Sequence, residues 1–203
     1  MKKIGFISLG CSKNLVDTEM MIGLMEKAGY EMTEDLNEAN VIIINTCTFI
    51  DAAKDESVQT LLQATEYKKN GKCEKLVAAG CLSQQFQEGL AREIPELDVL
   101  LGTESWSKIL DAVNESYRTG KQVNCFDSAP CEHEELIPRQ LVTPKYTAYV
   151  KIAEGCNNGC TFCYIPYVRG KARSRPIPSV VHEVKRLAAQ GVKEFNLIAQ
   201  LLW

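Results

Sequence analysis

The chain has 203 residues, of which 45% are hydrophobic and 24% are charged, and its formal net charge is −3. This length is enough for one or two domains with a real hydrophobic core. From the net charge we expect no extensive non-specific surface for nucleic acid in this portion, while specific contact with RNA stays open. The N-terminus lacks the apolar region and cleavage pattern of a signal peptide, and no stretch of 18 apolar residues occurs, so we expect a cytoplasmic protein without a membrane partner.

The first half of the chain alternates between short apolar strands and amphipathic helices. Buried strands are predicted over residues 3–10, 41–45, 76–79 and 98–101. The predicted apolar faces of the first two helices are Met21, Leu24, Met25 and Ala28, and then Val58, Leu61, Leu62 and Thr65. The first helix should end near Gly29, and further helices should begin near Ser83 and Ser105. Strands that alternate with helices predict a parallel α/β sheet.

Three of the nine cysteines, Cys11, Cys47 and Cys81, come directly after predicted strands, and we call them the strand-end trio. Because the carboxyl ends of parallel strands lie on one edge of a sheet, we expect these residues to converge. Residues suited to cap the following helices are Ser12 or Asn14, Thr48 or Asp51, and Ser83. A single cysteine in such a place is usually a small buried apolar residue, but three in equivalent places favour ligands of one metal cluster.

Residues 127–145 separate two regular parts of the chain. They contain prolines and acidic residues without an apolar period, which predicts a linker between a domain at 1–126 and a second domain at 146–203. The remaining cysteines, Cys73, Cys125 and Cys131, lack the placement of the strand-end trio, and we expect them to be unliganded. His133 and His182 are expected to be solvated or packed rather than ligands.

The second part begins with a strand that leads into a cysteine-rich loop. The alternating apolar positions of this strand are Tyr146, Ala148, Val150 and Ile152. A helix should begin at Pro178 and Ser179 and end at Gly191, before a strand over 192–199. The apolar face of that helix is predicted to hold Val180, Val184 and Leu187. The pattern therefore predicts a strand, a cysteine loop, a helix and a strand.

The loop carries Cys156, Cys160 and Cys163 in a C-x3-C-x2-C spacing, and we call them the loop trio. Thiolates favour iron–sulfur clusters or zinc. A structural zinc site uses four protein ligands, whereas three cysteines around a four-iron cube leave one iron open, so the lack of a local fourth ligand favours a cluster. A zinc loop or a reduced cysteine cluster stays the alternative. The basic residues that follow are either solvated or close to an anionic cluster or a substrate carboxylate: Arg169, Lys171, Arg173 and Arg175.

These motifs resemble the radical S-adenosylmethionine (SAM) methylthiotransferases over nearly the whole chain. The matching stretches are residues 8–17, 45–51, 79–81, 154–163, 169–171 and 173–176. The residues around Cys11 and Cys47 are similar to the branch that modifies an aspartate of the small-subunit ribosomal protein S-twelve. The branch that modifies adenosine in tRNA usually carries other residues after both cysteines.

The resemblance implies an enzyme with two 4Fe-4S clusters. The loop trio would hold the cluster that cleaves S-adenosyl-L-methionine, with Phe162 beside this cofactor, and the strand-end trio would hold an auxiliary cluster. In this family one SAM donates a methyl group to sulfur, a second provides a radical, and a reducing electron donor is needed. The implied reaction adds a methylthio group to the β carbon of the aspartate. Methylthiolation of tRNA adenosine and a non-catalytic metal-binding module stay as alternatives.

The resemblance also implies the fold: a parallel-sheet α/β domain, followed by the first strand–helix–strand part of a radical SAM (partial TIM-like) barrel. Members of the family continue with further strand–helix units and a small C-terminal β-barrel. After Gln200 the ribosomal-protein branch usually has aspartate, where this chain has Leu201. We therefore expect Leu201, Leu202 and Trp203 to be foreign to the family, and a truncated chain that is inactive by itself.

Overall fold

The computed structural model describes residues 1–126, 131 and 133–200. The prediction that Leu201, Leu202 and Trp203 are foreign to the family lies outside the described residues, as do residues 127–130 and 132 of the predicted linker. Among the helices that the structure describes, none combines the length and the hydrophobicity needed to span a lipid bilayer.

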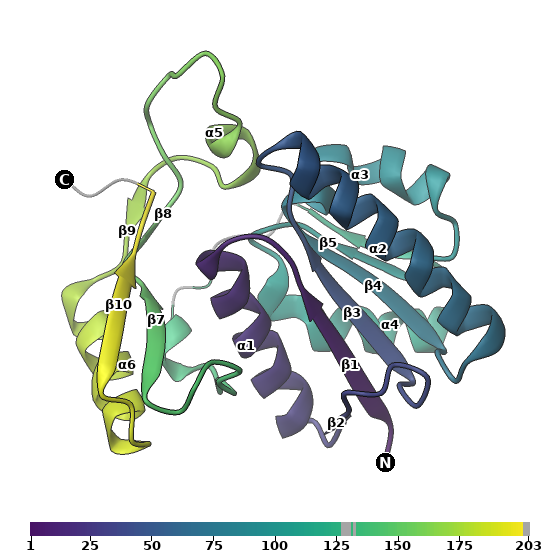
Figure 1. The fold of residues 1–203 in the computed structure, drawn as a ribbon, viewed down its shortest axis with the longest axis horizontal. Coiled ribbons are helices and arrows are strands. Elements are labelled where there is room, and N and C mark those ends of the chain that lie inside the picture. The colour runs from purple at the N-terminus through teal and green to yellow at the C-terminus, as the bar shows by residue number, and fades with distance from the viewer. Residues whose placement is uncertain (127–130, 132, 201–203) are drawn as a thin grey trace.

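The first part of the chain forms a six-stranded parallel sheet with the strand order β2-β1-β3-β4-β5-β6 (Figure 1). The strands are β1 Lys3–Ser8, β2 Glu31–Met32, β3 Val41–Thr46, β4 Lys75–Gly80, β5 Val99–Leu101 and β6 Val123–Cys125. The central strands β3 and β4 are buried along their whole length, as parallel strands are when helices cover both faces of the sheet. This confirms the predicted parallel α/β architecture. The edge strands β2 and β6 were not predicted, because their residues, EM and VNC, do not form the continuous apolar run that made the equally short β5 visible.

Helices cover both faces of this sheet. They are α1 Ser12–Lys27, α2 Asp51–Asn70, α3 Cys81–Glu93, and α4 Ile109–Thr119 with the preceding 3-10 turn η1 Trp106–Lys108. Met20 and Met21 of α1 and Val113 of α4 belong to one core, whereas Leu61 of α2 and Leu82 of α3 belong to the other. Each core therefore lies between the sheet and one pair of helices.

Two of the predicted helix faces are partly wrong. Ala28 and Leu62 are exposed, and the buried positions of α2 are Ser57, Leu61, Ala64 and Thr65. α1 differs most, because it is buried on nearly all sides, including the charged side chains of Asp17 and Glu19. Its side away from the sheet is covered by the second part of the chain, which a prediction from a single helical period could not include.

The second part of the chain forms a smaller unit. Its elements are β7 Thr147–Lys151, β8 Ala153–Glu154, α5 Ile165–Val168, β9 Arg173–Ser174, α6 Ile177–Ala189 and β10 Glu194–Ile198. β7 and β10 pair in parallel, and Leu187 of α6 packs on Ala148 and Val150 of β7. The predicted strand–helix–strand order is thus confirmed. The antiparallel pair of β8 and β9 and the short helix α5 were not predicted.

The predicted linker packs against both parts of the chain. It contains the 3-10 turn η2 Glu134–Leu136, and Arg139 within it is buried. The Arg139 guanidinium donates to Glu19 Oε2 in α1 at 2.5 Å and to Glu183 Oε1 in α6 at 2.7 Å. A segment that looked like a polar connection therefore carries a buried ion pair to each side. The domain boundaries themselves stay a prediction.

Candidate metal centres

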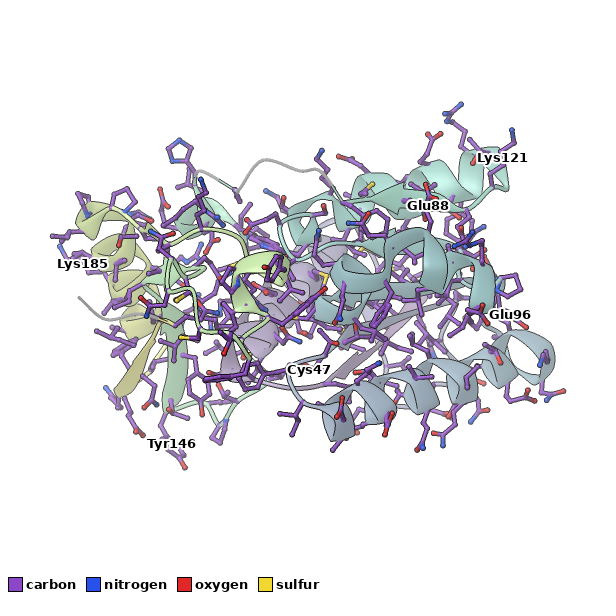
Figure 2. All side chains as sticks on the ribbon, turned by 90° about the horizontal axis from the view of Figure 1, so that it is seen from above. Cys47, Glu88, Glu96, Lys121, Tyr146 and Lys185 are labelled. Carbon is purple, nitrogen blue, oxygen red and sulfur yellow. The ribbon has the colours of Figure 1, made fainter. Side chains whose placement is uncertain are left out.

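The three cysteines of the strand-end trio line one cavity of about 570 Å³. Cys47 directly follows β3, Cys81 directly follows β4, and Cys11 lies shortly after β1. These strands are neighbours in the sheet, so their carboxyl ends bring the three thiols to one edge, as predicted. In Figure 2, Cys47 lies between the second part of the chain, marked by Tyr146 and Lys185, and the helices of the first part.

The cavity has the chemistry of a site for a soft metal centre. All three cysteines are free; Cys47 and Cys81 are buried and Cys11 is exposed. Burial raises the pKa of Cys81 to about 11, while the charge of Arg169 acts in the opposite direction. A metal would displace the protons of these thiols on binding.

Two glycines let the loops around the cavity approach closely. At Gly10, with φ of +86°, an added Cβ would lie 2.6 Å from Cys47 Cβ. At Gly80, with φ of +91°, an added Cβ would lie 2.2 Å from Asn45 Oδ1. Only glycine fits this close approach at both positions. The two glycines therefore allow the loops that carry the cysteines to pack closely together.

The donor set fits a cluster held by three thiolates. Among the described residues, no three cysteine, histidine or acidic side chains are close enough to hold one metal ion. In a four-iron cube each thiolate binds a different iron, so the three sulfurs need not meet at one point. The strand-end trio therefore suits a cluster, and its role as ligands stays a prediction.

The predicted helix caps are wrong. The residues at the N-cap positions of α1, α2 and α3 are Cys11, Ile50 and Gly80, and no side chain caps any of these helices. Asn14, one of the predicted caps, turns inward instead and donates from Nδ2 to the carbonyl oxygens of Leu9 at 3.0 Å and Thr46 at 2.9 Å. This amide therefore joins the β1 and β3 loops that carry the first two cysteines of the strand-end trio.

The loop trio lines a second cavity of about 600 Å³, together with Tyr167 and Lys171. Its three cysteines are also free. The backbone N–H of Asn158 donates to Cys156 Sγ at 3.4 Å, as a backbone that supports a thiolate would. Phe162 is 91% exposed and does not line either cysteine cavity, so its predicted place beside a cofactor stays a prediction.

The other cysteines lie apart from both cavities. Cys73 is buried and donates to the carbonyl oxygen of Lys75 at 3.3 Å. Cys125 and Cys131 are half-buried and pack against the core under α1 and α4. His133 and His182 are exposed and do not line a cysteine cavity.

The basic loop after the loop trio is not simply solvated. Arg169 is only 4% exposed and lines the cavity of the strand-end trio. Arg175 Nη1 contacts Glu183 Oε2 at 2.5 Å, and Arg173 pairs with Glu104. Lys171 lines the cavity of the loop trio. The alternative of a solvated loop is therefore wrong for Arg169, which lies beside the predicted cluster ligands.

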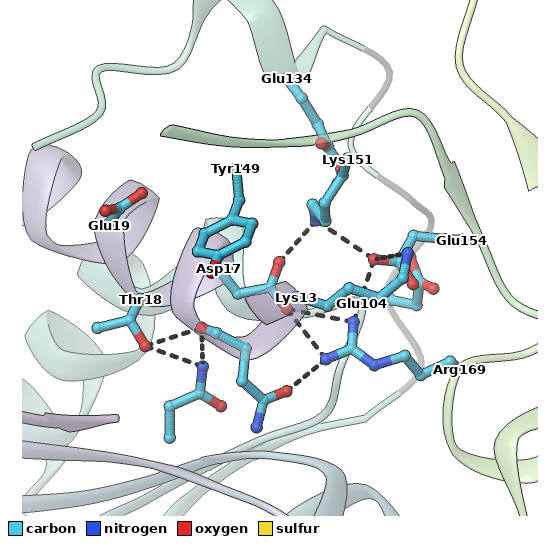
Figure 3. A network of polar contacts seen from close by, with 12 residues as sticks. Lys13, Asp17, Thr18, Glu19, Glu104, Glu134, Tyr149, Lys151, Glu154 and Arg169 are labelled. Atoms are coloured by element: carbon cyan, nitrogen blue, oxygen red, sulfur yellow. Dashed lines mark hydrogen bonds and ion pairs between the residues drawn. The ribbon is translucent and has the colours of Figure 1, made fainter. Parts of the chain in front are cut away.

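The sequence did not predict a buried ionic network between the two parts of the chain (Figure 3). The ammonium of Lys151 is 2.6 Å from Asp17 Oδ1, and it lies 3.5 Å from one oxygen each of Glu134 and Glu154. Burial lowers the pKa of Lys151, but the three carboxylates outweigh this effect and raise it. The available signal was the pair of acidic residues, Asp17 and Glu19, which directly precede the apolar run Met20–Met25 of α1.

Comparisons with known proteins agree with this geometry. Residues 3–102 match the family described as "Uncharacterized protein family UPF0004", and residues 150–200 match the "Radical SAM superfamily". Two relatives are both called "Ribosomal protein uS12 methylthiotransferase RimO". The one from Symbiobacterium thermophilum is 50% identical over 98% of this chain and 41% of that protein. The one from Syntrophotalea carbinolica is 51% identical over 98% of this chain and 44% of that protein.

The chain thus spans less than half the length of these relatives. Among solved structures, a radical S-adenosylmethionine methyltransferase, TsrM, from Kitasatospora setae with cobalamin and a 4Fe-4S cluster bound has a similar fold. Its TM-score is 0.61 at 14% sequence identity, over 98% of this chain and 48% of that one. At this identity the similarity concerns the fold alone.

Proposed function

We propose that this chain, which belongs to the radical SAM methylthiotransferase family, is part of an enzyme that methylthiolates the β carbon of an aspartate in small-subunit ribosomal protein S-twelve. The observation that carries the proposal is the presence of two cysteine trios, each of which lines a cavity of its own. The shared name of the similar relatives supports the substrate, and a ribosomal substrate would place the enzyme in the cytoplasm.

The proposed cofactors are SAM and two 4Fe-4S clusters, which, when bound, supply the radical and sulfur chemistry that an unactivated C–H bond requires. The strand-end trio would provide three ligands for the auxiliary cluster. The loop trio would provide three ligands for the other cluster and leave one corner for SAM, with Phe162 near this cofactor. A reducing electron donor is a further partner of this proposal.

The short helix α5 supports a reaction that uses both sites. Tyr164, Ile165 and Val168 line the cavity of the strand-end trio, whereas Pro166 and Tyr167 line the cavity of the loop trio. The Tyr164 and Tyr167 rings lie 5.1 Å apart between their centroids. Neighbouring sites hold two reacting groups in a productive arrangement, which removes much of the entropic cost of bringing them together.

Apolar side chains line much of the cavity of the strand-end trio, and they include Phe49, Ile50 and Leu197. These three side chains are exposed, so the lining would keep water away from a reactive carbon centre only once a bound group covers it. Because most of the lining is apolar, the few polar side chains of the cavity, above all Arg169, would interact most strongly with any charged group bound there.

The cluster proposal is tested by anaerobic reconstitution with iron and sulfide, followed by iron analysis and Mössbauer spectroscopy. We expect two cubane clusters in the wild-type chain, and one cluster after replacement of all three cysteines of either trio by alanine. Cys73→Ala is the matched control and should leave the iron content unchanged, because Cys73 is buried away from both cavities. A single cluster in the wild-type chain would refute the two-cluster proposal.

Zinc bound at the loop trio, without SAM cleavage under reducing conditions, would favour a non-catalytic metal-binding module. The substrate is tested separately with a protein of the full length of the relatives. It is incubated with ribosomal protein S-twelve or with tRNA, and mass spectrometry detects the added methylthio group. Modification of the tRNA alone would refute the ribosomal substrate while leaving the reaction class intact.

A further inference from the structure

Arg169 comes from the second part of the chain, but its guanidinium is buried at the cavity that the strand-end trio lines. Arg169 Nη2 and Cys81 Sγ both contact Asn14 Oδ1, so the guanidinium lies next to this cysteine of the trio. The N-terminal sheet thus supplies the three thiols, while a segment more than 80 positions later in the sequence supplies a permanent positive charge beside them.

Three polar side chains hold the guanidinium in place (Figure 3). Nη1 donates to Glu154 Oε1 at 3.1 Å and to Asp17 Oδ2 at 3.3 Å. Nη2 donates to Asn14 Oδ1 and also to Asp17 Oδ2 at 3.3 Å. A planar guanidinium that is bound on several sides keeps one orientation, which a flexible ammonium would not do as well.

Asn14 links this guanidinium to the sulfur. Its Nδ2 donates to two backbone carbonyl oxygens, so its Oδ1 is turned toward Arg169. The same Oδ1 accepts a hydrogen bond from Cys81 Sγ at 3.8 Å while this thiol is protonated, so Asn14 lies directly beside Cys81. Because Asn14 is completely buried and fixed by the loops of β1 and β3, it defines where Arg169 lies relative to Cys81.

The formal charges of the surrounding network balance only while Arg169 is present. Around Arg169 and Lys151 the network has three cations and three carboxylates: Lys13, Lys151, Arg169, Asp17, Glu134 and Glu154. Arg175 also lies 3.8 Å from Glu134 and connects this group to a further balanced set, in which Arg175 and Arg139 pair with Glu183 and Glu19. Removing the charge of Arg169 would leave an excess negative charge next to the three thiolates. In a buried site such a charge is weakly screened, so it would act strongly on any centre bound there.

We infer that Arg169, oriented by Asn14, is a positioning residue that sets the reduction potential of the cluster bound by the strand-end trio, an inference that rests on the proposed function. A cluster gains a negative charge when it is reduced, so a nearby fixed cation stabilises the reduced form and raises the potential. Net charge and hydrogen bonds to the sulfurs are the main protein contributions to such potentials.

The test uses the chain with Cys156, Cys160 and Cys163 replaced by alanine, so that only the cluster of the strand-end trio is observed. Redox titration monitored by electron paramagnetic resonance is carried out on this parent and on its Arg169→Gln and Arg169→Lys variants. In Arg169→Gln we expect the ratio of reduced to oxidised cluster at a fixed potential to fall at least about tenfold, equivalent to about 59 mV for one electron. Arg169→Lys keeps the charge and should retain most of the parent potential.

Arg173→Gln is the control, because Arg173 is in the same loop but pairs with Glu104 and does not line this cavity. It should titrate like the parent.

Three results would overturn the inference. The first is a reduction potential in Arg169→Gln that equals that of the parent. The second is a shift of the reduction potential that is equally large in Arg169→Gln and Arg169→Lys. The third is loss of the cluster from both variants, which a residue needed only for packing would produce. Absence of iron from the parent itself would instead refute the auxiliary cluster of the proposed function, and this inference with it.

Discussion

Replacement of Gly10 by alanine tests whether the close approach of the cysteine loops is needed to hold a metal centre. The new Cβ would lie 2.6 Å from Cys47 Cβ and 2.7 Å from Cys47 Sγ. Carbon atoms pack at about 3.5–4.0 Å, so one of the two loops must move by roughly 1 Å. Cys47 is poorly able to move, because Ser57 Oγ accepts from its N–H at 2.9 Å and donates to its carbonyl oxygen at 2.8 Å.

The backbone adds a second, smaller cost. Gly10 has φ of +86°, and an alanine in this left-handed region costs roughly 1–2 kcal/mol. Gly29→Ala separates the two effects, because Gly29 has φ of +90° but no atom within 4 Å of an added Cβ. Both variants should lose a similar backbone contribution to the free energy of unfolding, and only Gly10→Ala should also displace a cysteine of the strand-end trio.

The assay compares urea unfolding with the iron and sulfide bound after anaerobic reconstitution. We expect Gly29→Ala to bind as much iron as the wild type, and Gly10→Ala to bind about half as much, since only the cluster of the strand-end trio would be lost. Equal iron in the two variants would refute the argument that this loop contact positions Cys47 as a ligand.

Two further predictions concern parts of the fold outside the cysteine cavities. Arg139→Met leaves the fully buried Glu19 without its cation, whereas Glu183 keeps its ion pair with Arg175, so urea denaturation should show a loss of about 3–5 kcal/mol in the free energy of unfolding. The double variant in which Arg139 and Glu19 are both apolar, with the Arg175–Glu183 pair left intact, should recover most of this loss; no recovery would mean that the unpaired charge of Glu19 is not the cause. Burial raises the pKa of Cys73 from 9.0 to about 11, so the protonated thiol stabilises the fold below pH 9 and this contribution is lost as the pH rises toward 11. Relative to Cys73→Ala, the wild type should lose about 2–3 kcal/mol of unfolding free energy over this range, and parallel pH profiles would contradict the prediction.

The amino-acid sequence by itself determined the order of the main elements and the place of the cysteines within it. Apolar runs and helical periods are local properties, so the central strands and the crossover helices could be read directly. Because Cys47 and Cys81 directly follow such strands, the rule that parallel strands end on one edge was enough to predict that the strand-end trio converges. The spacing of the loop trio was equally local.

Only the tertiary structure decided which charged side chains are buried and what they contact. Asp17 and Lys151 are 134 positions apart, and Asp17 and Arg169 are 152 positions apart, yet each pair forms buried contacts. Taken alone, each of these residues belongs in water, because an unpaired charge is very costly to bury. Their burial follows from packing the second part of the chain against α1, which brings their partners together and places Arg169 beside Cys81.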